Sequence, residues 1–255
     1  MSGAVKGWCP GALRPMESGD GLVVRVRPHG GRLTAAQALR LADLAETAGS
    51  GVIDLGSRAH LQLRGVRAAA LPELHAALAD MELLDPDPAQ EARRNILTTP
   101  VWREEDATLR LVAALEAALA DGPVLPPKFG FAVDTGAAAV LGGASADIRI
   151  ERAGDGLILR ADGMVLGEPV TEAEAPARAL ALARWFAAGG GGRMAQRIAA
   201  GTLPPLEATT PPLTGAPICP GPTPFGACRA LPFGQMEAAV LRHLAVAPLR
   251  LTPWR

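Results

Sequence analysis

The fold is decided by one stretch, which reads Leu22-Val-Val-Arg-Val-Arg27, then Val52-Ile-Asp-Leu-Gly-Ser-Arg58, then His60-Leu-Gln-Leu-Arg-Gly-Val66. Successive side chains of a strand point to opposite faces, so Arg25 and Arg27 share one face and the neighbouring valines share the other. Each segment therefore predicts a strand with one apolar face and one polar, mostly cationic face.

The same alternation sorts the other two segments. Their polar sets are Asp54 with Arg58, and His60 with Gln62 and Arg64. Leu61 and Leu63 fall on the opposite face. We therefore expect a sheet with a continuous apolar side.

Two helices are predicted around these strands. Thr34-Ala-Ala-Gln37 is a capping box, and Gly49 ends the helix that it begins. The second helix follows the third strand and has Pro72 in its first turn. Their apolar stripes predict that both helices cover the apolar face of the sheet, which leaves the polar face open.

The open face carries four arginines against one carboxylate: Arg25, Arg27, Arg58 and Arg64 against Asp54. Arginine holds carboxylates bidentately, so this face suits a flat ligand with several carboxylates. An antiparallel sheet covered on one side also shows polar residues to water without binding anything. The pattern alone leaves both interpretations open.

Composition excludes several classes of protein. The chain has 255 residues and a net charge of -1, and of its 25 basic residues only Lys6 and Lys128 are lysines. We therefore expect no nucleic-acid partner. No apolar run has the length of a signal peptide or a membrane span, so the sequence predicts a cytoplasmic protein without a membrane partner.

Longer motifs resemble a known family. Val24-Arg-Val-Arg-Pro-His-Gly-Gly31 and the run from Gly51 to Val66 are similar to the ferredoxin-like half-domain of the nitrite and sulfite reductases. The resemblance narrows to the precorrin-3B synthases, the aerobic cobalamin-pathway branch of that superfamily. The motifs that narrow it are Gly7-Trp-Cys-Pro-Gly11, Ser18-Gly-Asp-Gly21 and Leu125-Pro-Pro-Lys-Phe-Gly-Phe-Ala-Val-Asp134.

The resemblance implies a set of site residues. It places an arginine on the substrate side of a tetrapyrrole at Arg94-Asn95 and an active-site lysine at Lys128, and these two cations are the expected catalytic residues. The expected binding residues, which would neutralise and orient a tetrapyrrole, are Arg25, Arg27, Arg58, Gln62, Arg64 and Asn95. Redox chemistry would belong to the cofactor.

One position departs from the reductase pattern. In the sulfite reductases a second lysine follows two residues after the first, where this chain has Gly130. A site that handles sulfite or nitrite must neutralise a small oxyanion and deliver protons, so the missing lysine weakens that interpretation.

The resemblance and the patterns together predict an α/β (α+β) protein of the nitrite/sulfite reductase type. We expect a ferredoxin-like half-domain over residues 1–84, a second α/β domain over 85–201, and a Pro/Gly-rich linker over 202–231. Residues 232–255 are expected to begin a second half-domain that stays incomplete. Within the second domain, residues 147–150, 157–160 and 164–166 predict a three-stranded meander, because Asp-Gly pairs separate them.

The family activity is oxygen-dependent hydroxylation and lactone formation on precorrin-3A, with a 4Fe-4S cluster and iron, or siroheme in the reductases. The family's cluster cysteines lie in a segment expected after residue 255, and Cys9, Cys219 and Cys228 do not replace a four-thiolate set. No metal ligand is therefore predicted, and whether the chain is an enzyme by itself stays open.

The resemblance implies an anionic tetrapyrrole as ligand and a separate C-terminal half as partner. Two alternatives remain: a fragment of a siroheme-type nitrite or sulfite reductase, and a non-catalytic or vestigial tetrapyrrole-binding protein.

Overall fold

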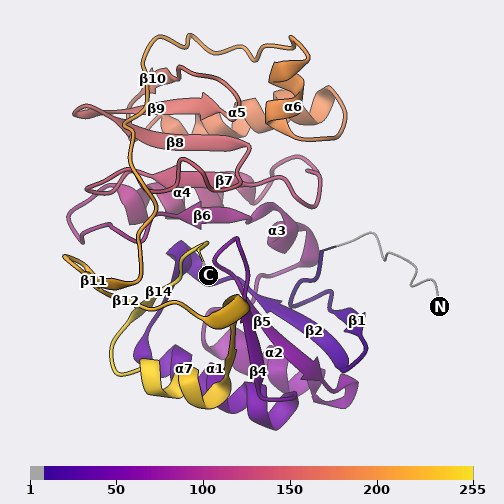
Figure 1. Ribbon diagram of the computed structural model, residues 1–255. Coiled ribbons are helices and arrows are strands. Elements are labelled where there is room, and N and C mark those ends of the chain that lie inside the picture. Colours follow the sequence, from indigo (N-terminus) through magenta and orange to yellow (C-terminus); the bar gives the residue numbers. More distant parts are fainter. Residues whose placement is uncertain (1–8, 255) are drawn as a thin grey trace.

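A computed structural model describes residues 9–254, which form two units stacked one above the other (Figure 1). Gly7 and Trp8 of the opening motif lie outside the described residues. The first sheet has the strand order β1-β2-β5-β4-β13 and the second has the order β10-β9-β8-β7-β6. The fold combines helices and sheets, as expected.

The first sheet is built from strands that pair antiparallel throughout. They are β1 (Met16–Ser18), β2 (Gly21–Val26), β4 (Val52–Leu55), β5 (Leu61–Val66) and β13 (Gln235–Glu237). Helices α1 (Ala35–Ala48) and α2 (Leu71–Asp80) share one apolar core with these strands. The predicted capping box of α1 is present, and Pro72 lies in the first turn of α2.

The predicted alternation of the first sheet is confirmed, but its polar face is not open throughout, because Arg27 and His60 are buried. Val24, Leu61 and Leu63 are fully buried in the core beneath the helices, whereas Arg25 and Gln62 are only partly covered. Alternation along each strand therefore separates a packed side from a polar side.

The second sheet combines three parallel strands with an antiparallel pair. They are β6 (Ile96–Thr98), β7 (Phe131–Asp134) and β8 (Ile148–Ala153), then β9 (Gly156–Ala161) and β10 (Glu168–Val170). Helices α4 (Thr108–Leu119) and α5 (Ala175–Ala188) pack on it in a second core, and α3 (Pro88–Arg93) and α6 (Met194–Ala199) complete the unit.

One predicted strand of the second unit is wrong. The meander continues at β10, and not at residues 164–166, where Val165 is 82% exposed. A side chain at Gly167 would lie 2.9 Å from the carbonyl oxygen of Leu159, so the chain approaches β9 closely there before pairing begins at Glu168. The apolar run at residues 164–166 therefore did not identify the strand that pairs with β9.

The expected linker is an extended segment with little regular structure, and it runs down one side of both units (Figure 1). It contains a bridge between Thr210 and Gly167 and, further on, a short hairpin of β11 (Gly221–Thr223) and β12 (Gly226–Cys228). The hairpin was not predicted.

The C-terminal segment joins the first unit and forms no separate unit of its own. It contains β13, α7 (Ala238–Leu244) and β14 (Leu249–Arg250), and it repeats the order of β3 (Arg32–Leu33), α1 and β4. The pairing is reciprocal: β13 pairs with β4, β14 pairs with β3, and α7 packs on α1. Met236 and Leu241 are consequently buried in the first core.

The turns that precede the two repeats share a backbone conformation. Gly30 has φ 62° and ψ 16°, and the matching Phe233 has φ 57° and ψ 12°. Glycine adopts this left-handed conformation freely, whereas a residue with a Cβ is strained there. The second repeat therefore accepts strain at a phenylalanine that is 95% exposed.

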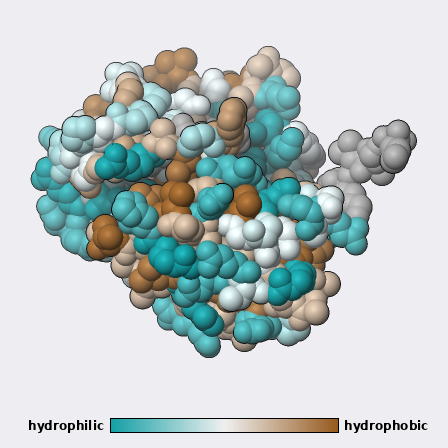
Figure 2. Space-filling view, turned by 60° about the horizontal axis from the view of Figure 1, so that its bottom comes forward, coloured by the Kyte–Doolittle hydropathy of each residue, from teal (hydrophilic) through white to brown (hydrophobic). Residues whose placement is uncertain are grey.

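The surface gives no sign of a membrane segment. Within residues 9–254, no helix combines the length and the apolar character that a membrane span requires. On the face shown in Figure 2, hydrophilic atoms dominate and hydrophobic ones gather in small separate patches.

Candidate functional site

A row of polar residues crosses the open face of the first sheet. Arg25 on β2 lies opposite Gln62 on β5, Gln62 lies opposite Asp54 on β4, and Asp54 lies opposite Gln235 on β13. The Gln235 amide nitrogen donates to Asp54 Oδ1 at 2.9 Å. Side chains directly opposite one another in antiparallel strands share a face, so the row is continuous.

At one end of this face the first sheet meets the second unit, and cations gather there. We call the set Arg25, Arg27, Arg58 and His60 the cationic junction. Arg58 Nη2 donates to the carbonyl oxygen of Lys128 at 3.1 Å. Arg27 Nη1 donates to the carbonyl oxygen of Glu91 and lies 3.8 Å from Glu91 Oε1. Both contacts tie the first sheet to the second unit.

Glu91 is mainly committed to the N-terminal loop. Its Oε1 accepts from the Ala12 backbone N–H at 2.6 Å, and its Oε2 accepts from the Leu13 N–H at 3.2 Å. A side chain at Gly11 would lie only 2.4 Å from this carboxylate, so glycine is needed for the approach. Glu91 thus neutralises only part of the charge of the junction.

Three buried nitrogen atoms of the cationic junction have no hydrogen-bond partner among residues 9–254: Arg25 Nε, Arg27 Nε and His60 Nδ1. Five such side-chain atoms were found in the described chain, so most of them concentrate here. Buried polar atoms of folded proteins are normally paired, because an unpaired one costs about 1 to 3 kcal/mol. Within the described residues, buried hydrogen-bonding atoms are therefore least satisfied at the junction.

The pKa values of the junction residues are lowered mainly by burial. Burial lowers the pKa of Arg25, and it lowers that of Arg27 to about 10 despite the nearby Glu91. Burial, reinforced by the surrounding arginines, holds the pKa of His60 well below its ordinary value. A nearby anion would act in the opposite direction, because it favours the charged form of each group.

The loop that carries Arg58 and His60 is strained. Ala59 between them has φ 55° and is 3% exposed. The loop is closed by hydrogen bonds from Ala59 N to Gly56 O and from Gly56 N to His60 O, both of 2.9 Å. Left-handed residues other than glycine are uncommon and concentrate at functional sites. No sequence signal marks Ala59.

Arg94, Asn95 and Lys128 lie near the junction, and each makes different contacts. Arg94 is buried, and Asp85 holds its guanidinium through contacts of 2.7 and 2.8 Å, with Glu116 at 3.5 Å. Asn95 Nδ2 donates to the carbonyl oxygen of Phe129 at 2.6 Å. Lys128 presents an exposed side chain beside Arg58.

Arg64 lies further along β5, away from the junction contacts. Its Nη2 donates to Ser18 Oγ at 3.1 Å, and its two terminal nitrogens lie 3.5 Å from Asp20 and 3.8 Å from Asp54. The structure therefore brings together Arg25, Arg27 and Arg58, and it gives Arg64 anionic partners of its own.

Gly130 is closed to any side chain in this conformation. A Cβ there would lie 2.7 Å from Asn95 Nδ2. The Gly130 N–H also donates to the buried carboxylate of Asp147 at 3.0 Å. The position where the sulfite reductases carry a second lysine is thus filled by Asn95.

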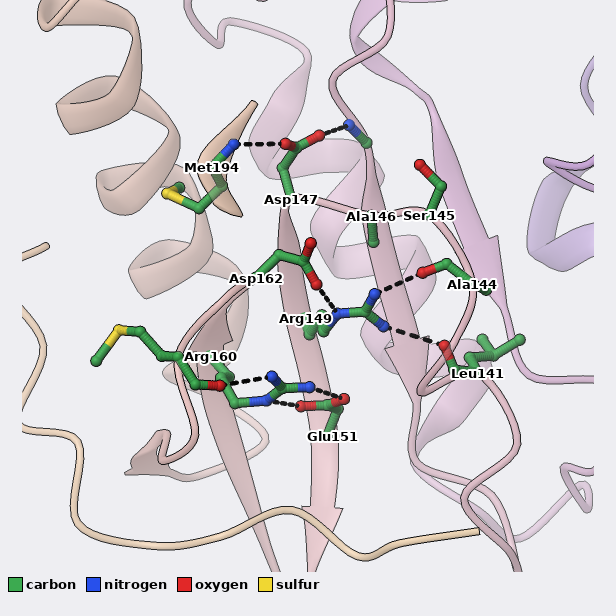
Figure 3. A network of polar contacts seen from close by, with 12 residues as sticks. Leu141, Ala144, Ser145, Ala146, Asp147, Arg149, Glu151, Arg160, Asp162 and Met194 are labelled. Carbon is green, nitrogen blue, oxygen red and sulfur yellow. Dashed lines mark hydrogen bonds and ion pairs between the residues drawn. The ribbon is translucent and has the colours of Figure 1, made fainter. Parts of the chain in front are cut away.

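A second cluster of arginines lies in the second sheet, and all its members are paired (Figure 3). Arg149 donates to Asp162 at 2.8 Å and to the carbonyl oxygens of Leu141 and Ala144. Arg160 is held bidentately by Glu151 at 2.6 and 2.7 Å. We call this set the paired network. It was not anticipated from the sequence.

The described residues offer no metal centre. Within residues 9–254, no group of three or more His, Cys, Asp or Glu side chains is placed to hold a metal ion. Cys9 lies at the junction beside Arg25, whereas Cys219 and Cys228 lie at the β11–β12 hairpin. The three thiols present therefore do not fit an iron–sulfur cluster.

Comparisons with known proteins agree with the fold. Residues 14–81 match the family described as the nitrite/sulfite reductase ferredoxin-like half domain. A precorrin-3B synthase of Sinorhizobium sp is 35% identical over 163 residues, which is 57% of this chain and 32% of that relative. The chain thus spans about a third of the length of this relative.

The NirA protein of Mycobacterium tuberculosis has a similar solved structure. The match has a TM-score of 0.59 at 16% identity, and it covers 91% of this chain and 52% of that chain. At this identity the likeness concerns the fold.

Proposed function

We propose that the cationic junction binds a tetrapyrrole bearing several carboxylates, and that the chain acts in cobalamin synthesis as a precorrin-3B synthase-like protein. The observation that carries the proposal is the concentration of unpartnered buried nitrogens at Arg25, Arg27 and His60. A carboxylate beside them would supply both the acceptor and the negative charge that the junction lacks. The relative from Sinorhizobium sp supports this choice of ligand.

In the proposed reaction, precorrin-3A is hydroxylated with oxygen and closes a lactone. The residues of this chain neutralise peripheral carboxylates and orient the macrocycle. Arg25 and Arg58 are the arginines of the junction least committed to carboxylates of the protein. Lys128 offers an exposed cation at the same edge. Residues 9–254 offer no group placed to hold iron, so the redox chemistry would come from a cofactor held outside them.

A siroheme-type reductase is the second candidate, and the fold match to NirA favours it. Such a site must place several cations on one small oxyanion. Gly130 leaves no room for the second lysine, and Arg94 is already held by two carboxylates. The structure therefore supports a large polycarboxylate better than sulfite or nitrite.

A non-catalytic tetrapyrrole-binding protein is the third candidate. It shares the ligand chemistry of the first and lacks its turnover. An assay with precorrin-3A, a reductant and oxygen separates the two, since only the enzyme consumes precorrin-3A. Iron content and absorbance of the purified chain identify siroheme, which is intensely coloured.

The binding proposal is tested by fluorescence titration with uroporphyrin, an octacarboxylate. Arg25→Ala and Arg58→Ala should each weaken binding about tenfold or more, because a charged hydrogen bond in a desolvated site contributes about 1.5 to 3 kcal/mol. Arg110→Ala is the matched control, since Arg110 is an exposed arginine paired with Glu172 on the second unit. Equal losses in all three variants would show a nonspecific charge effect and contradict the assignment.

A further inference from the structure

His60 stands out in the junction because it is the one member of this set that is not an arginine. It is 4% exposed, it follows the strained Ala59, and its Nδ1 has no partner among the described residues. A buried imidazole normally places Nδ1 against an acceptor or a donor, which fixes its tautomer. Among the described residues, no such contact fixes the protonation state of His60 Nδ1.

The charged groups around His60 are mostly cations. Arg25 on β2, Arg27 directly after β2, Arg58 in the loop before His60 and Arg94 directly after α3 all act on its charge.

The anions near these cations are committed elsewhere. Glu91 is bound by the Ala12 and Leu13 backbone, and Asp85 is bound by Arg94, which Glu116 also approaches. Cys9 lies beside Arg25. Lys128, whose backbone accepts from Arg58, adds a further cation at the edge of the junction.

Two physical effects therefore act on His60 in the same direction. Burial disfavours its charged form, and four guanidinium groups repel a fifth positive charge. A carboxylate that enters the junction removes much of this repulsion. The imidazole then gains a proton that the free protein does not hold, and by linkage the protonated form binds the carboxylate more tightly.

We infer that His60 couples ligand binding to proton uptake: when a carboxylate of the tetrapyrrole occupies the cationic junction, the His60 imidazole takes one proton from solvent. The inference rests on the proposed function, because it needs an anionic ligand in that site. It gives His60 a role of its own. Through its charge, His60 would set the pH range in which the ligand binds.

Isothermal titration calorimetry with uroporphyrin tests the inference. Titrations between pH 6.0 and 7.5 in phosphate and in Tris reveal proton uptake, because the observed heat then depends on the ionisation enthalpy of the buffer. Porphyrin carboxylates titrate near pH 4 to 5, below this window. The wild type should take up close to one proton at its maximum, and its affinity should rise as pH falls, by up to about tenfold per pH unit.

His60→Asn and His60→Gln keep a polar side chain that cannot take up the proton. Both should bind with heats independent of the buffer and with an affinity that stays flat across the window. His243→Asn is the matched control, because His243 is exposed on α7, and it should retain the uptake of the wild type.

The outcomes separate this inference from the function on which it rests. Binding of uroporphyrin by the wild type without proton uptake overturns the role of His60 and leaves the proposed ligand standing. Uptake that persists in both His60 variants also overturns the role, since another group then takes the proton. Failure of the wild type to bind uroporphyrin overturns both proposals.

Discussion

The cationic junction and the paired network both contain clustered arginines, but the hydrogen bonding of these arginines differs. In the paired network, Arg149 and Arg160 are engaged by carboxylates and carbonyl oxygens (Figure 3). In the junction, Arg25 and Arg27 each have a buried nitrogen with no partner among residues 9–254. The number of arginines is similar, so clustering alone does not distinguish a structural site from a binding site. What distinguishes the two sites is whether the hydrogen-bond donors of the arginines have partners.

The largest expected effect would test this contrast directly. Arg149→Met should lower the free energy of unfolding by about 3 to 5 kcal/mol, because it leaves Asp162 and two carbonyl oxygens without their partner. Arg25→Met should change it by less than about 1 kcal/mol, since a nonpolar group of similar size replaces a poorly paired buried cation. Urea denaturation of both variants measures the difference.

Similar losses from the two substitutions would break the comparison. The arginines of the junction would then be as structural as those of the network. Binding of uroporphyrin provides the second measurement, because Arg25→Met should lose it and any folded Arg149→Met protein should keep it.

A second test concerns the packing beneath the junction. Leu63→Ala should cost about 2 to 5 kcal/mol, because it opens a cavity in a fully buried position under the helices. Gln62→Ala, one residue away on the polar face, should cost less than about 1 kcal/mol. Chemical denaturation ranks the two, and the opposite order would mean that β5 faces the other way.

The pH dependence of stability would sharpen the comparison at His60. Its pKa is depressed in the folded state, whereas in the unfolded chain it is about 6.5. As pH falls through 6.5, the unfolded state binds a proton that the folded state does not, so stability decreases. Each unit of depression corresponds to about 1.4 kcal/mol. His60→Asn should remove this acid sensitivity in thermal unfolding followed between pH 7.5 and 5.5, whereas His243→Asn should keep it.

The smallest expected effect separates strain at the junction from strain elsewhere. Ala59→Gly and Phe233→Gly should each stabilise the chain by about 0.5 to 1 kcal/mol, because glycine relieves a left-handed conformation and gives back part of that gain in the unfolded state. Only Ala59→Gly should weaken uroporphyrin binding, since it makes the loop that positions Arg58 more flexible. A loss of binding in Phe233→Gly as well would show that strain marks no particular site.

Local patterns were sufficient for what depends on neighbouring residues. Alternation placed Leu61 and Leu63 against Gln62, and the Thr34 capping box located the start of α1. These features depend on backbone geometry within a few residues, which the sequence displays directly.

The partners of the site residues could not be read from the sequence. Glu91 reaches the loop at Ala12 across 79 positions, and Gln235 reaches Asp54 across 181. The motif predicts a site role for Arg94 but does not show that Asp85 accepts a hydrogen bond from its guanidinium. Whether a charged side chain is free or paired is decided by tertiary contacts, and no periodicity reports them.

The reciprocal pairing of β13 with β4 and of β14 with β3 has a consequence for protein synthesis. The second unit is inserted between two parts of the first, so the first sheet cannot acquire its β13 edge until Glu237 has left the ribosome. During that interval the β4 edge and the surface of α1 that α7 covers stay exposed, while the inserted unit can already collapse. Contacts across such long sequence separations form slowly. The nascent chain should therefore depend on chaperones most while the linker is being translated. At that stage the C-terminal segment, which covers the β4 edge and part of α1, has not yet been synthesised.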